Sequence, residues 1–206
     1  MKRKVILLSG KKQVGKDTFA SIICANKKHP FFATALATEL KDQVLYMGTQ
    51  VLGIPKQYMQ DCLHKPELKE KILCTQNFRD SGKPCTARSL MQWYGQMIKT
   101  AFDELFWVNT LLKHWVFDDL CTYHIIITDC RFKYELEELK SRLKDRFDVV
   151  TVRIKRKASL LDSDISETDL DLVDDSYFDY VLKNNSSIRE FRQKVLGIRS
   201  KILGRK

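Results

Sequence analysis

The chain lacks the features that would place it in a membrane or outside the cell. None of its apolar runs approaches the roughly 20 residues that cross a bilayer. The apolar run near the amino terminus, Val5–Leu8, is too short for the hydrophobic segment of a secretory signal. The sequence therefore excludes an integral membrane protein and predicts a cytoplasmic location with no membrane partner.

Metal-binding and redox motifs are also missing. No two of the six cysteines have C-x-x-C spacing, which argues against a zinc site and for free thiols in a reducing compartment. None of them is accompanied by a recognisable base, so we expect no cysteine nucleophile. The four histidines show no ligand spacing and are expected in packing or surface roles.

Internal repeats and low-complexity linkers are absent as well. The length of 206 residues, with 44% hydrophobic and 30% charged residues, suits one soluble globular domain with a substantial core. We therefore expect a single domain over residues 1–206.

The formal net charge is +10, but the charges are unevenly distributed. Residues 161–182 contain eight acids and no Lys or Arg, whereas residues 183–206 contain eight basic residues and one acid. The basic tail also carries apolar residues at helical spacing, which favours a packed terminal helix with a solvated face over a nucleic-acid partner. A positive field also attracts small anionic substrates.

What the sequence does contain is a phosphate-binding pattern near its start. The apolar run Lys4–Ser9 leads into a loop bounded by Gly10 and Gly15, and the amphipathic stretch Phe19–Ile23 follows Lys16 closely. Strand, loop and helix in this order are the context of a P-loop. Backbone N–H groups of such a loop surround a polyphosphate, and the helix dipole favours the negative charge. An ordinary glycine turn before a helix is the less favoured interpretation.

The side chains of this loop indicate how a nucleotide would be held. We expect Lys16 to bridge the outer phosphates as a point charge. Asp17 stands where Ser or Thr usually holds magnesium, and a carboxylate can meet this hard cation directly or through water. Thr18 remains available to the inner phosphate.

Strands and helices alternate along the rest of the chain. Strands are predicted over residues 30–36, 123–128, 148–154 and 177–182. Helices are predicted from the end of the 30–36 strand to about residue 47, over 88–102, 106–117 and 133–144, and at the carboxyl end. Residues 48–84 are irregular in pattern, with a short helix over 67–73. The alternation predicts an α/β fold with a central parallel sheet flanked by helices.

A second candidate site follows the predicted strand 123–128, because open α/β sheets place their ligands at the carboxyl ends of strands. Asp129 can hold magnesium or orient the attacking group there, and Arg131 can clamp a phosphate. An aspartate at this position alone is more often a helix cap, but the P-loop reverses that preference. Phosphoryl transfer depends on cancelling negative charge. Further candidate cations are Lys41, Arg88, Lys99 and Arg156.

An acidic segment over residues 161–175 follows the basic cluster Lys155–Lys157. Phosphoryl transfer needs a movable cover that excludes water, and a polar segment beside cations suits that task. A plain surface loop explains the same pattern equally well.

These motifs, in this order, resemble those of the deoxynucleoside monophosphate kinases of large DNA phages and related viruses, a branch of the P-loop kinases. Gly10–Thr18 is similar to the family's G-x-x-x-x-G-K-D-T loop, including its unusual aspartate. Arg88–Gln92, followed by Gly95, resembles the R-x-x-L-Q-x-x-G helix, and Thr128–Phe132, followed by Glu135, resembles the T-D-x-R-F-x-x-E block. Similar blocks also lie at Phe32–Lys41, Phe106–Trp107, Arg156, Ser166–Leu170 and Asp179–Asn185.

The resemblance implies a P-loop kinase sandwich with a helical region for the monophosphate over about residues 37–118 and a lid over about 155–176. It implies transfer of the γ-phosphate of ATP to a deoxynucleoside monophosphate, with Mg²⁺, in the host cytoplasm if the source is a virus. Base preference, sugar preference and a homodimer are left open.

The resemblance also implies roles for particular residues. The implied ATP-binding residues are Gly10, Lys12, Val14, Gly15, Lys16, Asp17 and Thr18. The implied monophosphate-binding residues are Lys41, Arg88, Gln92 and Lys99, of which Lys99 stands where the family often has arginine. The implied catalytic residues are Lys16, Asp129, Arg131 and Arg156, and the implied metal ligands are Asp17 and Asp129.

Two alternatives remain. The animal phosphomevalonate kinases resemble the same branch and share the G-K-D loop and an aspartate–arginine strand end, but Gln92, Gly95 and Phe132 favour the nucleotide kinases. A P-loop protein that binds nucleotide or nucleic acid without catalysis is supported by Asp17 and the basic tail. Against it, such a protein does not need cations in several further segments.

Overall fold

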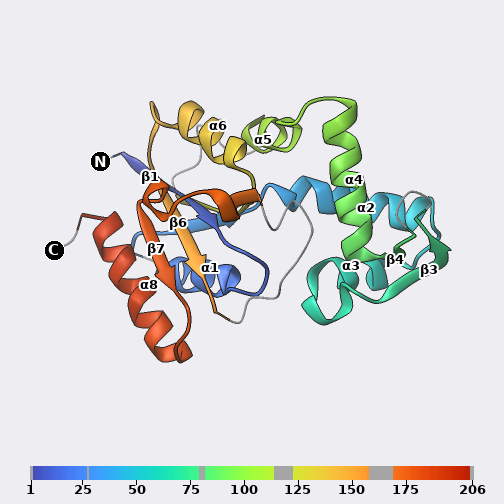
Figure 1. Cartoon of the computed structure of the whole chain (residues 1–206), viewed down its shortest axis with the longest axis horizontal. Coiled ribbons are helices and arrows are strands. Elements are labelled where there is room, and N and C mark those ends of the chain that lie inside the picture. The colour runs from blue at the N-terminus through green and yellow to red at the C-terminus, as the bar shows by residue number, and fades with distance from the viewer. Residues whose placement is uncertain (1, 27, 79–81, 114–122, 158–168, 205–206) are drawn as a thin grey trace. The chain divides into compact units, whose positions relative to one another are not determined.

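The computed structural model describes residues 2–26, 28–78, 82–113, 123–157 and 169–204 (Figure 1). The chain forms two compact units. Unit 1 comprises Met1–Leu36 and Trp115–Lys206, and unit 2 comprises Ala37–His114. None of the helices built from the described residues has the length and hydrophobicity of a membrane-spanning segment.

Unit 1 is built on a five-stranded parallel sheet with the strand order β2-β5-β1-β6-β7. Its central strand β1 pairs on one side with β5, where Ile6 lies beside Ile126, and on the other side with β6, where Ile6 lies beside Val150. Continuous apolar runs form these strands because helices cover both faces of the sheet. The strands are β1 (Arg3–Ser9), β2 (Phe31–Thr34), β5 (His124–Cys130), β6 (Phe147–Lys155) and β7 (Tyr180–Lys183). The α/β fold with a parallel sheet predicted from the sequence is confirmed.

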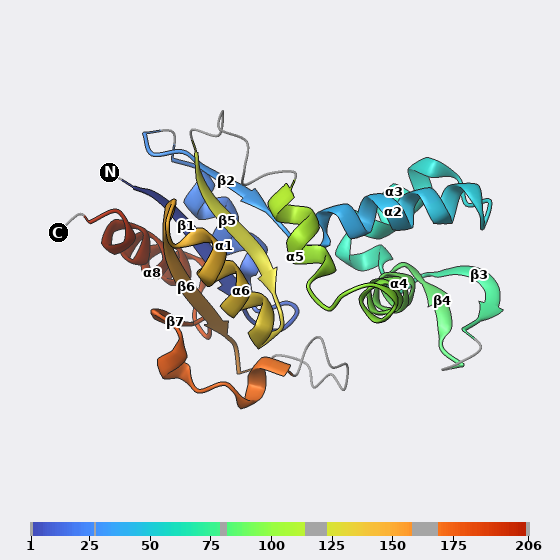
Figure 2. The same ribbon diagram turned by 90° about the horizontal axis from the view of Figure 1, so that it is seen from above.

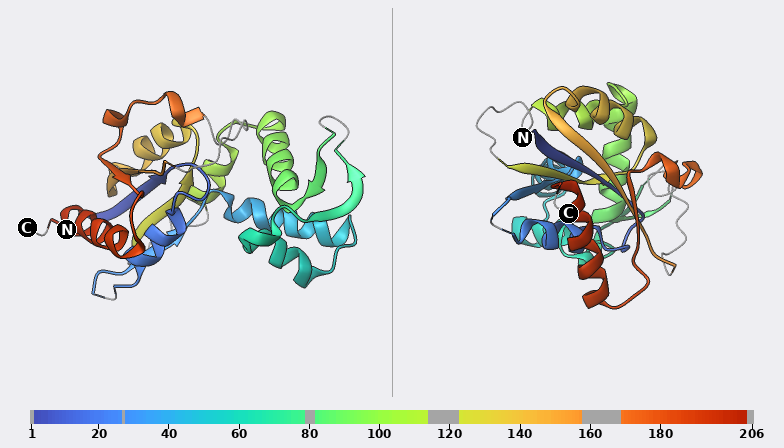
Figure 3. Two further views of the ribbon diagram at one scale, coloured as in Figure 1. Left: turned by 60° about the horizontal axis from the view of Figure 1, so that its bottom comes forward. Right: turned by 90° about the vertical axis from the view of Figure 1, so that its left-hand side faces the viewer.

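The helices of unit 1 lie on opposite faces of this sheet. Helices α1 (Lys16–Cys24) and α8 (Ile188–Ile202) pack on one face, and α6 (Lys133–Leu143) covers the other (Figure 2, Figure 3). Phe19 of α1 and Phe191 of α8 are both buried in one hydrophobic core with residues of the sheet. This packing holds the loop between β1 and α1 at the carboxyl edge of the sheet.

Unit 2 combines helices with a short hairpin. Its core is formed by apolar, cysteine and methionine side chains, including Val44, Met59 and Leu90. Helix α4 begins with a capping box, in which Thr86 and Ser89 each accept a hydrogen bond from the other's backbone N–H. The elements are α2 (Ala37–Gln50), α3 (Lys56–His64), the 3-10 turn η1 (Pro66–Leu68), β3 (Ile72–Asn77), β4 (Pro84–Thr86), α4 (Ala87–Ala101) and α5 (Phe106–Leu111).

Several predicted elements differ from the structure. The helix predicted over residues 67–73 is wrong, because η1 ends at Leu68 and β3 starts at Ile72. The region 48–84 is not irregular, since it contains α3 and the antiparallel pair β3–β4. The predicted last strand begins later than expected, because Asp174 caps a 3-10 turn, η4 (Asp175–Tyr177), before β7.

Parts of two predicted elements fall outside the described residues. Residues 114–117 of the helix predicted over 106–117 are among them, and so are residues 158–168 of the predicted lid. The described residues that follow form the 3-10 turn η3 (Asp169–Leu172) and then η4.

Candidate functional site

The loop between β1 and α1 has a backbone that only particular residues can adopt. Gly10 has φ +145°, and a Cβ atom there would lie 2.5 Å from the carbonyl oxygen of Ile154. Gly15 has φ +105° and forms the N-cap of α1. Left-handed φ values and close backbone approach both require glycine at these two positions.

The Lys16 side chain folds back over this loop. Its ammonium group donates to the carbonyl oxygens of Gly10 at 2.5 Å and of Lys11 at 2.7 Å. The lysine therefore places its positive charge against the loop at the start of α1, where the helix dipole also favours an anion. Asp17, the next residue, is exposed in the first turn of α1, and Thr18 is half-buried.

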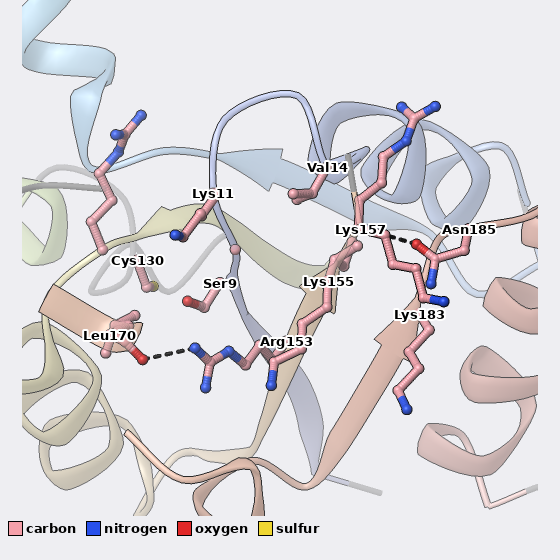
Figure 4. A pocket seen from close by; sticks show the side chains of 14 residues that line it. Ser9, Lys11, Val14, Cys130, Arg153, Lys155, Lys157, Leu170, Lys183 and Asn185 are labelled. Carbon is pink, nitrogen blue, oxygen red and sulfur yellow. Dashed lines mark hydrogen bonds between the residues drawn. The ribbon is translucent and has the colours of Figure 1, made fainter. Parts of the chain in front are cut away.

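A cavity of about 360 Å³ adjoins the loop (Figure 4). It lies at the carboxyl ends of β1, β5, β6 and β7, because residues at or just after the end of each of these strands line it. Seven of its 14 described lining residues are Lys or Arg, and none of the described ones is acidic. The cations are Lys11, Arg131, Arg153, Lys155, Arg156, Lys157 and Lys183. Such a cavity concentrates positive potential where a polyphosphate would bind.

These cations differ in how they are held. The Arg153 guanidinium is buried and donates to the carbonyl oxygen of Leu170 at 2.7 Å (Figure 4). It also donates to the carbonyl oxygen of Val173 at 2.7 Å. The Asp175 carboxylate pairs with Arg153 at 3.3 Å and with Lys155 at 2.6 Å. Arg153 therefore serves mainly to fix the 170–175 segment, whereas Arg156 is exposed at the cavity and available to a ligand.

The turn after β5 is fixed by two carboxylates. Asp129 Oδ1 accepts a hydrogen bond from the N–H of Leu36 at 2.6 Å, which ties the end of β5 to the segment after β2. The buried Glu135 accepts from the N–H groups of Arg131 at 2.9 Å and Phe132 at 3.2 Å. Glu135 thereby orients the backbone that carries Arg131 into the lining of the cavity.

Cys130 lies between these two carboxylates in the sequence and also lines the cavity. Burial raises the pKa of its thiol well above the ordinary value, and the charges of Glu135 and Asp129 raise it further. A protonated thiol is a poor nucleophile. Cys130 is therefore a packing residue in the cavity wall.

The described residues contain no cluster of three or more His, Cys, Asp or Glu side chains that could hold a metal ion by themselves. Mg²⁺ does not require one, because it is usually bound through one or two carboxylates together with substrate phosphates and water. Asp17, on the first turn of α1, and Asp129, at the end of β5, are carboxylates of this kind in unit 1.

The residues predicted to bind the monophosphate lie in unit 2. Lys41 is on α2, and Arg88, Gln92 and Lys99 follow along α4. The Arg88 guanidinium forms an ion pair with Glu70. The backbone N–H of Arg88 donates to the Lys69 carbonyl oxygen at 3.0 Å. Helical spacing puts Arg88 and Gln92 on one face of α4.

The sequence pattern of the family "Deoxynucleotide monophosphate kinase" matches residues 49–195, which is more than half of the chain. The chain belongs to this family. The match confirms the resemblance drawn from the motifs and identifies the protein as a nucleotide kinase. The loop Gly10–Thr18 lies before the matched residues, so its geometry is an independent observation.

Comparisons of the kinase with solved structures and with curated proteins add no further family assignment. A solved structure of a candidate kinase from Chloroflexus aurantiacus is similar over 100% of both chains, with a TM-score of 0.42 and 12% identity. No curated protein matches the chain. The family assignment therefore rests on the sequence match.

The structure brings some of the predicted site residues of the kinase together. Gly10, Val14, Arg131 and Arg156 all line the cavity, and Lys16 contacts two of its lining residues through their carbonyl oxygens. The four residues predicted for the monophosphate lie apart from them in the chain, in unit 2. The positions of these residues are observed, but the binding and catalytic roles of all the predicted site residues, including Gly15, Lys12, Asp17, Thr18 and Asp129, stay predictions.

Sequence reasoning missed several residues of the cavity. Arg153, Lys155, Lys157 and Lys183 line it from the carboxyl ends of β6 and β7 or just beyond, and so does Asn185. The rule that ligands bind at the carboxyl ends of parallel strands applies to these positions as it does to Asp129. It could have assigned Lys155 and Lys157 to the cavity, because they belong to the basic cluster that follows a predicted strand, whereas Arg153 lies within that strand.

Proposed function

We propose that the kinase transfers the γ-phosphate of ATP to a deoxynucleoside monophosphate and releases the deoxynucleoside diphosphate and ADP. One observation carries the proposal: a cavity rich in Lys and Arg adjoins the loop before α1, in a chain that belongs to the deoxynucleotide monophosphate kinase family. The family is named for a kinase activity, which a protein that only binds nucleotide would not have.

The donor triphosphate is proposed to bind at the loop of unit 1. Backbone N–H groups at the start of α1 would surround the inner phosphates, and Lys16 would exchange its carbonyl partners for the outer phosphate oxygens. Gly10 suits this role, because the absent side chain lets the loop backbone approach Ile154 closely. Arg131 and Arg156 would then cancel the charge that develops on the transferred group.

Magnesium fits the residues at this edge of the sheet. Asp17 and Asp129 would hold it, directly or through water, together with phosphate oxygens. When bound, Mg²⁺ supplies neutralisation of the phosphate charge. Asp129 suits this role because the Leu36 N–H fixes the carboxylate at the end of β5. This assignment rests on the chemistry of the two carboxylates.

The acceptor is proposed to bind through unit 2. Arg88 would clamp the monophosphate with two parallel hydrogen bonds, a geometry that a planar guanidinium provides and an ammonium does not. A phosphate would replace Glu70 as the partner of this guanidinium. Lys41 would add a point charge, and Gln92, one turn after Arg88, would contact the nucleoside.

A panel of deoxynucleoside and ribonucleoside monophosphates, each with ATP and Mg²⁺, tests the proposal. Formation of a deoxynucleoside diphosphate with an equal amount of ADP supports it, and Lys16→Ala should abolish this reaction while the far-UV spectrum is kept. Phosphomevalonate in the same assay separates the related small-molecule kinases, because turnover of that compound alone contradicts the proposal. Salt-dependent binding of duplex DNA with no turnover of any monophosphate would instead favour a nucleic-acid-binding protein.

A further inference from the structure

Two adjacent asparagines, Asn184 and Asn185, follow the end of β7 and have no role in the proposed reaction. We propose that Asn184 is a positioning residue that orients the Val14–Gly15 peptide of the loop toward the triphosphate. This inference rests on the proposed function, because it concerns the same phosphate site.

Asn184 is fixed to two separate elements. Its backbone N–H donates to the carbonyl oxygen of Lys155, at the end of β6, at 2.8 Å. Its side-chain Nδ2 donates to the carbonyl oxygen of Val14, in the loop before α1, also at 2.8 Å. The carboxyl ends of β6 and β7 thus hold one particular peptide of the loop from outside.

The direction of this hydrogen bond determines where the next N–H points. In a trans peptide the C=O and the following N–H point in opposite directions. Because the Val14 carbonyl is directed at Asn184, the Gly15 N–H is directed away from Asn184. Gly15 is the N-cap of α1, where free N–H groups bind anions, so a fixed Gly15 N–H is a prepared donor for phosphate.

The fit between Asn184 and the loop is close. A Cβ atom on Gly15 would lie 2.7 Å from Asn184 Nδ2 and 3.6 Å from the ring of Phe191, so a side chain at position 15 would displace the amide. The Val14 side chain is buried, and its packing further limits rotation of the Val14–Gly15 peptide. The glycine of the loop and the asparagine after β7 are therefore adapted to each other.

Asn185 extends the same arrangement to the cations of the cavity. Its Oδ1 accepts a hydrogen bond from the Lys157 N–H at 2.8 Å (Figure 4). The pair thus connects the loop, through Asn184, with the basic cluster after β6, through Asn185. The fixed point on the loop is Asn184 alone, because it is the one of the two that contacts Val14 in the described hydrogen bonds.

Asn184→Ala removes the donor without adding charge, and Asn184→Ser keeps a shorter one. Loss of one well-aimed donor to a charged phosphate should raise the KM for ATP by about 10- to 100-fold in Asn184→Ala. The KM for the monophosphate should stay within about 2-fold, and Asn184→Ser should fall between the wild type and Asn184→Ala. Asn26→Ala, a matched change at an exposed asparagine of unit 1, should alter neither constant.

A second measurement does not depend on turnover. In the ¹⁵N-labelled wild type, the Gly15 amide proton should shift downfield when ATP is added, as expected for a hydrogen bond to phosphate. The shift should be largely lost in Asn184→Ala and retained in Asn26→Ala.

The outcomes separate the two proposals. A wild type that binds ATP with the Gly15 shift but transfers no phosphate contradicts the proposed function and supports the role of Asn184. An active wild type whose Asn184→Ala variant keeps its KM for ATP, or raises both KM values equally, overturns the role of Asn184 alone. Failure of both Asn184 variants to fold would assign this residue to stability and also overturn the inference.

Discussion

Unit 1 and unit 2 hold their candidate ligand-binding residues by different means. In unit 1 the residues converge because parallel strands end at one edge of a sheet, so that the backbone itself gathers the cations of the cavity. In unit 2 the candidates lie along helices, and Arg88 is held by an ion pair with Glu70. We infer that the backbone of the unit 1 site is set before a ligand binds and that Lys16 has to exchange its partners there, whereas the unit 2 site depends on exchange of the ion pair of Arg88.

The largest effect is expected for the loop of unit 1. Lys16→Ala should lower kcat/KM by at least about 10³-fold, because the variant loses a charge that would act on the transferred phosphate. The free energy of unfolding should change little, because the Lys16 ammonium donates to carbonyl oxygens of the loop and Lys16 is not among the buried residues. Steady-state kinetics and urea unfolding check both parts. Full activity of the variant would contradict the proposed role of the unit 1 loop.

A smaller, selective effect is expected for unit 2. Arg88→Ala should raise the KM for the monophosphate by roughly 100-fold and leave the KM for ATP unchanged, because a clamp on the acceptor is lost. Glu70→Gln should act in the opposite direction and lower the same KM by about 3-fold, because Arg88 then has no competing carboxylate. If both variants raised it, the ion pair would serve to build the acceptor site, and the proposed exchange of partners would be wrong.

The same contrast explains what the sequence could predict. The strands of unit 1 were predictable because residues such as Ile125–Ile127 are buried on both faces, which leaves a continuous apolar run. Helix α3 was not, because its buried face consists of Met59, Cys62 and Leu63 in an otherwise polar segment. The hairpin β3–β4 is short, and its pairing is irregular between Ile72 and Asn77, so no alternation marks it.

Prediction of the site was limited in a similar way. Gly10, Gly15 and Lys16 could be assigned from the sequence, because the P-loop is a local pattern. The contact of Asn184 with Val14 could not, because the two residues are far apart in the chain and are brought together by the pairing of β1 with β6 and of β6 with β7.

The stability of unit 2 provides a third prediction. Thr86→Ala removes the side chain that accepts from the Ser89 N–H, so it should lower the free energy of unfolding by about 1 kcal/mol. Thr100→Ala, at an exposed position near the end of the same helix, is the matched control and should cost less. Urea unfolding followed by circular dichroism measures both variants. Equal losses would contradict the role of the capping box.

The smallest effect concerns pH and unit 1. Burial, together with nearby positive groups such as His29 and Lys4, lowers the pKa of His124 below its ordinary value of 6.5. Its Nδ1 accepts from the Lys4 N–H at 2.9 Å, which requires the neutral ring. The unfolded chain therefore binds a proton that the folded chain does not, and stability should fall as pH drops below 6.5.

His124→Gln, which keeps an acceptor, tests this prediction. The free energy of unfolding of the variant should fall less steeply between pH 7 and pH 5 than that of the wild type. His64, whose pKa is also lowered by burial, titrates in both proteins and cancels in the comparison. Identical slopes would mean that His124 does not contribute.

The proposed activity of this kinase is transfer of the terminal phosphate of ATP to a deoxynucleoside monophosphate. Transfer of label from γ-labelled ATP, with Mg²⁺ and one deoxynucleoside monophosphate at a time, measures it most directly. We expect the label to appear in the β-position of a deoxynucleoside diphosphate and ADP to form in equal amount. Label that appears only as inorganic phosphate, or stays in ATP with every deoxynucleoside monophosphate, would contradict it.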